Sequence, residues 1–227
     1  MNKEEKIETI IKQLIDDLKT IREPNSKHWN ERYLHHMFSY LVQQKTDYRI
    51  DITGAEDSSF HPEWATSIKV RREEGGVYAK IKIDGKEEYE PRNSRKSSRK
   101  KTQEDQTVGT SGFIDFAIGC FNNPDYAIEF KMAKNMDAKG FAFDYMKLLD
   151  SRNKITKAIS LCVIYGRKEK LEKTDLDANL EFAKDKLKNK GYLAKRDFCF
   201  YVLKIFEGEP PCLWKCTKFE DGFEESN

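Results

Sequence analysis

Residues 113–132, FIDFAIGCFNNPDYAIEFKM, decide the fold because they predict two neighbouring β-strands in the middle of the chain. The strands are expected over Phe113–Cys120 and Asp125–Met132, and the Asn-Asn-Pro sequence between them is typical of a turn. Side chains alternate between the two faces of a strand, so Glu129 and Lys131 share one face of the second strand and apolar residues occupy the other. These residues therefore predict a hairpin inside a larger sheet.

The segments on both sides of this hairpin predict further helices and strands. Apolar residues recur at helical spacing over Lys3–Glu23, and a second helix carries an apolar stripe from Trp29 to Leu41, with Ser26 or Asn30 as its N-cap. The later elements are expected to be a helix over Phe141–Arg152, a strand over Ala158–Tyr165, a helix over Leu176–Asn189 and a strand over Phe198–Phe206. This order predicts an α/β (α+β) fold with a mixed central sheet flanked by helices.

Other stretches carry weaker patterns. A β-hairpin is expected from Ile68–Val70 and Val77–Ile83, around a Glu-Glu-Gly-Gly turn. Residues 87–112 are polar and predict a long loop, and the polar tail Glu220–Asn227 is expected to fray. We therefore expect an N-terminal helix over residues 1–24, one domain over residues 25–219 and a flexible tail over residues 220–227.

Composition and charge exclude several classes of protein. The chain of 227 residues is long enough for one well-buried domain, and its net charge of +2 leaves local clusters to indicate partners. The longest nearly apolar stretch, Ala158–Tyr165, is too short to cross a bilayer, and the first residues, MNKEEKIE, lack the apolar region of a signal peptide. The five cysteines form no CxxC pair, and neither an HExxH motif nor a glycine-rich phosphate loop is present. We therefore expect a cytoplasmic protein that is not a zinc hydrolase and does not contact a membrane.

Asp115 is the only charged residue of the first central strand. A carboxylate between Phe113 and Ala117 is costly to bury unless a partner or a metal compensates. Pairing of the two strands places Asp115 beside Glu129 and Lys131, and two carboxylates about 4 Å apart repel by roughly 4 kcal/mol near a protein surface. A divalent cation removes this penalty, so the patch predicts a magnesium site in which Lys131 orients an attacking water. The alternative interpretation is a solvated strand face decorated with charges.

This pattern resembles a known signature. Asp115 followed by Glu129-Phe130-Lys131 is similar to the D…(D/E)-x-K motif of the PD-(D/E)XK nuclease superfamily, which has the restriction-endonuclease-like fold. Ile114 stands where the name of the family has proline. The resemblance extends over roughly residues 30–206 and implies an αβββαβ core, to which the first helix is an addition.

The resemblance also implies roles for individual residues. Asp115 and Glu129 would bind Mg²⁺ (or Mn²⁺), the carbonyl of Phe130 would add a ligand, and Lys131 would be the catalytic lysine. Glu31, at the start of the second helix, would support the metal. The alternative for Glu31 is a charge in a first helical turn, which the helix dipole favours by itself.

Further cations lie on either side of the two central strands. The segment PRNSRKSSRKK contains no acidic residue, and we expect it to contact the phosphates of a nucleic acid through Arg92, Arg95, Lys96, Arg99, Lys100 and Lys101. The alternative is a solvated basic tract. Lys147 is a candidate supporting residue on the helix that follows the Glu129 strand, although an exposed helix face is the favoured interpretation of Asp144 and Lys147.

The function expected from these residues is a magnesium-dependent endonuclease that hydrolyses phosphodiester bonds, with double-stranded DNA as partner. Two alternatives stay open: an RNA endonuclease, and a nucleic-acid-binding module on the same fold without catalytic activity. The amphipathic helix over Lys3–Glu23 predicts either a homodimer contact or packing against its own domain.

Overall fold

The structure is a computed structural model, and it describes residues 3–20, 30–50, 57–65, 79–83, 86–90, 113–133, 138–166 and 172–226. Within these ranges the chain forms four helices: α1 (Lys3–Lys19), α2 (Glu31–Lys45), α3 (Ala138–Leu149) and α4 (Lys173–Lys188). The strands of the main sheet are β1 (Arg49–Ile50), β2 (Ser59–Ala65), β5 (Phe113–Cys120), β6 (Asn123–Ala133), β7 (Lys157–Gly166), β8 (Asp197–Phe206), β9 (Cys212–Cys216) and β10 (Glu224–Ser226). A separate antiparallel pair consists of β3 (Ala79–Ile83) and β4 (Lys86–Glu90).

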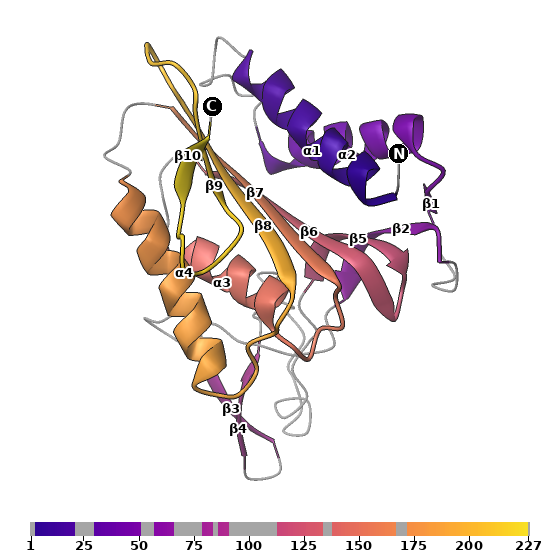
Figure 1. The fold of residues 1–227 in the computed structure, drawn as a ribbon. Helices are drawn as coiled ribbons and strands as arrows, with labels where there is room; N and C mark the ends of the chain where they lie inside the picture. The colour runs from indigo at the N-terminus through magenta and orange to yellow at the C-terminus, as the bar shows by residue number, and fades with distance from the viewer. Residues whose placement is uncertain are drawn as a thin grey trace, which may run out of the picture.

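The main sheet is mixed, with the strand order β1-β2-β5-β6-β7-β8-β9-β10 (Figure 1). Its central pairs, β6–β7 and β7–β8, are parallel, whereas β2–β5–β6 and β8–β9–β10 are antiparallel. Parallel neighbours need a long crossover connection, which α3 supplies between β6 and β7 and α4 supplies between β7 and β8. The predicted α/β architecture, a mixed sheet flanked by helices, is confirmed.

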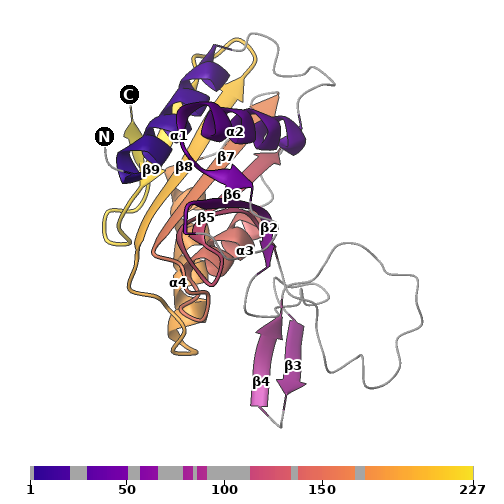
Figure 2. The ribbon, with the colours of Figure 1, turned by 90° about the vertical axis from the view of Figure 1, so that its right-hand side faces the viewer.

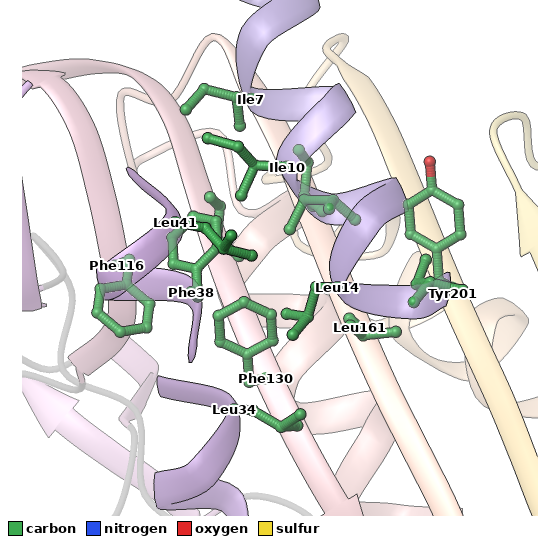
Figure 3. Close-up of a cluster of buried hydrophobic side chains, with 14 of the residues drawn as sticks. Ile7, Ile10, Leu14, Leu34, Phe38, Leu41, Phe116, Phe130, Leu161 and Tyr201 are labelled. Atoms are coloured by element: carbon green, nitrogen blue, oxygen red, sulfur yellow. The ribbon is translucent and has the colours of Figure 1, made fainter. Parts of the chain in front are cut away.

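Helices α1 and α2 cover one face of the sheet (Figures 1 and 2). The apolar stripe of α1 is buried, at 2% exposure or less, through Ile7, Ile10, Ile11, Leu14, Ile15 and Leu18. Figure 3 shows this stripe above the side chains of α2 and of the central strands, with Leu14 near Leu161 and Phe130. Of the two interpretations of this helix, packing against its own domain is therefore the one observed.

Helices α3 and α4 cover the opposite face. Their apolar side chains form a second core with the strands, and Tyr145 of α3 stacks on Phe200 of β8 with ring centroids 4.5 Å apart. Each of the central strands β6, β7 and β8 is thus buried on both faces, as the almost wholly apolar sequence of β7 requires. None of the helices in the described ranges has the length and apolar character needed to cross a membrane.

The structure differs from the sequence prediction at the weakly patterned stretches. Residues 79–83 pair with residues 86–90, so the expected loop begins later than residue 87, and the predicted strand Ile68–Val70 lies outside the described residues. The tail was expected to fray, but residues 224–226 pair with β9 and Phe223 is fully buried. Burial of this one aromatic ring in the core beside α3 holds the polar tail against the sheet.

Helix α2 begins at the N-cap Asn30, which is one of the two residues, Ser26 and Asn30, predicted for this role. The side chain of Asn30 accepts a hydrogen bond of 3.3 Å from the backbone N–H of Tyr33. Asn30→Ala removes this acceptor and is expected to lower the free energy of unfolding by about 1 kcal/mol, measured by urea denaturation. Asn30→Asp keeps an acceptor and serves as the control; equal losses in both variants would contradict a capping role.

Candidate active site

Strands β5 and β6 stop pairing where the predicted site begins. Their register ends at Phe116 opposite Ile128, and its continuation by one residue puts Asp115 opposite Glu129. The backbone N–H of Phe130, which is the next donor on this edge of β6, donates to Oδ2 of Asp115 at 2.7 Å. A carboxylate therefore satisfies a donor that a backbone carbonyl satisfies in a regular antiparallel pair.

Glu31 supplies a second carboxylate to the same edge of β6. Its Oε2 lies 3.4 Å from the backbone N–H of Met132, which donates to it. Residues two apart in a strand present their N–H groups to the same side, so Phe130 and Met132 are satisfied in succession by Asp115 and Glu31. Burial raises the pKa of Glu31, the charge of Asp115 raises it further, and Lys131 opposes this rise.

Glu129 lies on the face of β6 that α3 covers. Its side chain is almost completely buried, and its carboxylate forms an ion pair with the ammonium of Lys147. The same ammonium lies 3.1 Å from Oδ1 of Asp144 and donates to the carbonyl of Phe113 at 3.0 Å. Glu129 is therefore not a surface decoration, and the solvated-face interpretation is wrong for this residue.

The expectation of an exposed helix face for Asp144 and Lys147 is also wrong. Asp144 is 7% exposed, and the side chain of Lys147 is 10% exposed. These residues are three apart in α3, so they lie on one side of the helix, and that side meets β6 at Glu129. The apolar residues around them indicated the buried side of α3, but the carboxylate that Lys147 neutralises, Glu129, lies on a strand and is not visible in the helix sequence.

Burial and charge act against each other in this cluster. Burial raises the pKa of Glu129 well above its usual range, and the Lys147 ammonium opposes that rise. Burial acts to lower the pKa of Lys147, but the carboxylates of Glu129 and Asp144 outweigh it, so this pKa is raised. Lys147 is therefore protonated at neutral pH, as a cation enclosed by oxygen atoms.

Lys131 lies next to the cluster from its own position on β6. Its pKa is raised, first by the charge of Asp144 and then by Glu31 and Glu129, against the effect of partial burial. The structure thus brings Lys131 into the field of carboxylates from three separate elements, α2, β6 and α3. The amine is held charged near Asp144, Glu31 and Glu129, and its predicted position beside Asp115 stays a prediction.

His35 is a site residue that the sequence analysis missed. Its Nε2 lies 3.3 Å from Oδ2 of Asp115, and its ring packs edge-on against Phe116. Burial acts to raise the pKa of Asp115, but His35 and the Phe130 N–H outweigh it, so this pKa is lowered. The signal in the sequence is the spacing: His35 follows Glu31 by four residues and therefore shares its face of α2.

This contact predicts a pH-dependent stability. Burial acts to lower the pKa of His35, but the carboxylates of Asp115 and Glu31 outweigh it and the pKa is raised. The folded state therefore gains stability from protonated His35 below about pH 6.5, the ordinary histidine value, and loses this gain as the pH rises through the raised pKa. His35→Gln is expected to destabilise the protein more at about pH 5.5 than at about pH 8.5 in thermal melts.

The neighbouring His36 offers a matched control for this measurement, because it lies on the exposed side of the same helix. The destabilisation caused by His36→Gln should be the same at both pH values. An equal pH dependence in the two variants would show that Asp115 does not stabilise the charged form of His35.

The donor set fits a hard divalent cation in its chemistry. Asp115, Glu129 and Glu31 offer carboxylate oxygens, and the carbonyl of Phe130 faces the same side as its N–H, toward Asp115. In the described part of the chain no group of three or more His, Cys, Asp or Glu side chains is arranged to hold a metal ion. The contacts above show the reason: Glu129 is turned toward Lys147, while Asp115 and Glu31 are turned toward the backbone of β6.

The predicted site residues thus divide into two groups. The structure brings together Asp115, Glu129, Lys131, Glu31 and Lys147 through the contacts and charges described above. The basic residues Arg92, Arg95, Lys96, Arg99, Lys100 and Lys101 lie outside the described residues.

The chain was compared with family models, curated proteins and solved structures. No family model, no curated protein and no solved structure matches the chain. The functional assignment therefore depends on the residues of this site and on their contacts.

Proposed function

We propose that the protein is a Mg²⁺-dependent endonuclease of the PD-(D/E)XK type that hydrolyses phosphodiester bonds in double-stranded DNA. One observation carries the proposal: just beyond the last paired residues of β5 and β6, the Asp115 carboxylate accepts a hydrogen bond from the backbone N–H of Phe130, the residue between Glu129 and Lys131. Metal-assisted phosphodiester hydrolysis uses two carboxylates and an amine, which Asp115, Glu129 and Lys131 offer.

The order of the elements supports the restriction-endonuclease-like assignment. The sequence α2, β2, β5, β6, α3, β7 follows the αβββαβ order that the resemblance implies, with β1 and the β3–β4 pair as insertions. Glu31 on α2 is near Asp115, as the resemblance also implies for the helix before the sheet. Fold order alone is compatible with many activities, so this support is secondary to the site.

The balance of charge supports a divalent ion. Four carboxylates (Glu31, Asp115, Glu129 and Asp144) face the two ammonium groups of Lys131 and Lys147 and the imidazole of His35. Buried carboxylates in excess are costly unless cations neutralise them.

In this mechanism Asp115 and Glu129 would hold the metal, with Glu31 and the carbonyl of Phe130 as further oxygen donors. When bound, Mg²⁺ supplies Lewis-acid polarisation of a phosphate oxygen. Lys131 would stabilise the negative charge that develops on the phosphate and orient the attacking water through its ammonium hydrogens. His35 would hold the carboxylate of Asp115 in place from α2, acting as a positioning residue.

The basic segment supports a nucleic acid as substrate. The segment that precedes β5, the strand of Asp115, contains six basic residues and no acidic residue between them: Arg92, Arg95, Lys96, Arg99, Lys100 and Lys101. Such residues give contacts to phosphates that do not depend on base sequence, and binding then weakens steeply as salt rises. Duplex DNA is the substrate we propose.

The proposal is tested with supercoiled plasmid DNA, linear duplex DNA and a structured RNA, each with Mg²⁺, Mn²⁺ or EDTA. We expect nicking or linearisation of the plasmid that requires the metal and disappears in Asp115→Asn. Cleavage of the RNA alone would move the substrate to RNA. Salt-sensitive binding of DNA without cleavage under either metal would instead make the protein a binding module.

A further inference from the structure

Lys147 is a buried cation for which the D…(D/E)-x-K signature has no role. In the described structure, three oxygen atoms lie close to the Lys147 ammonium, which donates hydrogen bonds to two of them and forms an ion pair with the third. These are a carboxylate oxygen of Glu129, Oδ1 of Asp144 at 3.1 Å and the carbonyl oxygen of Phe113 at 3.0 Å. Two carboxylates and a carbonyl therefore surround one positive charge, a set of oxygen donors that also suits a hard metal ion.

Glu129 is common to this arrangement and to the proposed metal site. Its carboxylate is almost completely buried and forms an ion pair with Lys147. A divalent ion on the same carboxylate would be strongly repelled by an ammonium that kept its present contact, because both cations would share one buried group. Lys147 can keep a carboxylate partner after such a displacement, since Asp144 lies on its own helix.

We propose that Lys147 is the resident counter-ion of Glu129 in the metal-free protein, and that metal binding and the Lys147–Glu129 ion pair exclude each other. This inference rests on the proposed function, because it takes Glu129 as a metal ligand. Lys147 thereby keeps a buried carboxylate neutralised during folding, before any metal is present. It also weakens metal binding, since each ion must displace the ammonium before it reaches Glu129.

The test compares Mn²⁺ binding by calorimetry in the wild-type protein, Lys147→Met and Lys12→Met. Methionine has the length of the lysine stem without its charge, and Lys12 is an exposed residue of α1 that serves as the control. Lys147→Met is expected to bind Mn²⁺ at least about tenfold more tightly than the wild type, while Lys12→Met binds as the wild type does. In thermal melts, Mn²⁺ should raise the melting temperature of Lys147→Met more than that of the wild type.

The outcomes separate this inference from the proposed function. If the wild type binds Mn²⁺ and Lys147→Met binds it equally or more weakly, the counter-ion role is overturned and the nuclease proposal stands. Absence of Mn²⁺ binding in both proteins overturns the metal-dependent function, and the inference with it.

A measurement on the wild-type protein decides the question if Lys147→Met does not fold. In crystals grown with Mn²⁺, the ion should lie on Glu129, with the Lys147 ammonium withdrawn toward Asp144. An ion bound to Glu129 while Lys147 keeps its contact with the same carboxylate would overturn the inference.

Discussion

Lys131→Met is expected to lower the rate of Mg²⁺-dependent DNA cleavage by about 10²–10³-fold, the usual effect of removing one group that stabilises charge in a transition state. The reason is its position: the charged amine lies beside the carboxylates of Glu31 and Glu129, and its role requires no contact with the metal. The loss should appear in kcat, with a small change in KM for DNA, because Lys131 acts on charge that develops only during reaction.

Lys204→Met is the matched control, since Lys204 also lies on a central strand, where its ammonium stands 5.1 Å from the ring centroid of Trp214. Its cleavage rate should equal that of the wild type. Mn²⁺ binding should persist in Lys131→Met, which separates loss of chemistry from loss of the metal. Full cleavage by Lys131→Met would remove this residue from the mechanism and with it the D…(D/E)-x-K interpretation.

Glu129→Ala should lower the free energy of unfolding by about 3–5 kcal/mol in urea denaturation with EDTA present, because it leaves the buried ammonium of Lys147 without its main partner. The double variant Glu129→Ala/Lys147→Met removes both charges and should recover part of this loss. The interaction energy from the double-mutant cycle measures the pair directly.

A surface ion pair of the same charge types gives the control. Glu181 and Lys184 are 2.9 Å apart on α4, and the side chain of Glu181 is 47% exposed. Glu181→Ala should cost no more than about 1 kcal/mol, since solvent screens exposed pairs. A loss as small as this in Glu129→Ala would show that Glu129 and Lys147 are not coupled in the folded protein, and it would also weaken the counter-ion inference.

Long, strongly periodic segments were predicted from sequence with useful accuracy. Helices α1, α2, α3 and α4, and strands β5, β6, β7 and β8, lie within a few residues of their predicted bounds. Strands β2 and β9 were missed, because each is short and carries polar residues, and β2 also contains Pro62. Such strands are stabilised by pairing with a neighbouring strand and not by their own sequence. The partner of β2 is β5, which lies far away in sequence, and the partner of β9 is β8, which lies across an irregular turn.

In the candidate site, too, local contacts were predicted from sequence and distant ones were not. The sequence predicted that β5 and β6 pair as a hairpin, which is observed, because both strands and their turn are contiguous in sequence. The sequence did not show which face of α3 would meet Glu129, or that His35 would lie 3.3 Å from Asp115. These contacts join elements separated by many residues, so they depend on how the helices pack on the sheet.

The amino-acid sequence alone determined which segments are helices and strands in the periodic regions, and which residues carry the acid, acid and amine pattern, because periodicity and short-range register are local properties. Only the tertiary structure decided that Glu129 is buried under α3, that Lys147 neutralises it, and that Asp115 and Glu31 hold the open edge of β6. The physical reason is that the cost of a buried charge depends on every group packed around it, and those groups come from four elements, α2, β5, β6 and α3, that meet only in the folded protein.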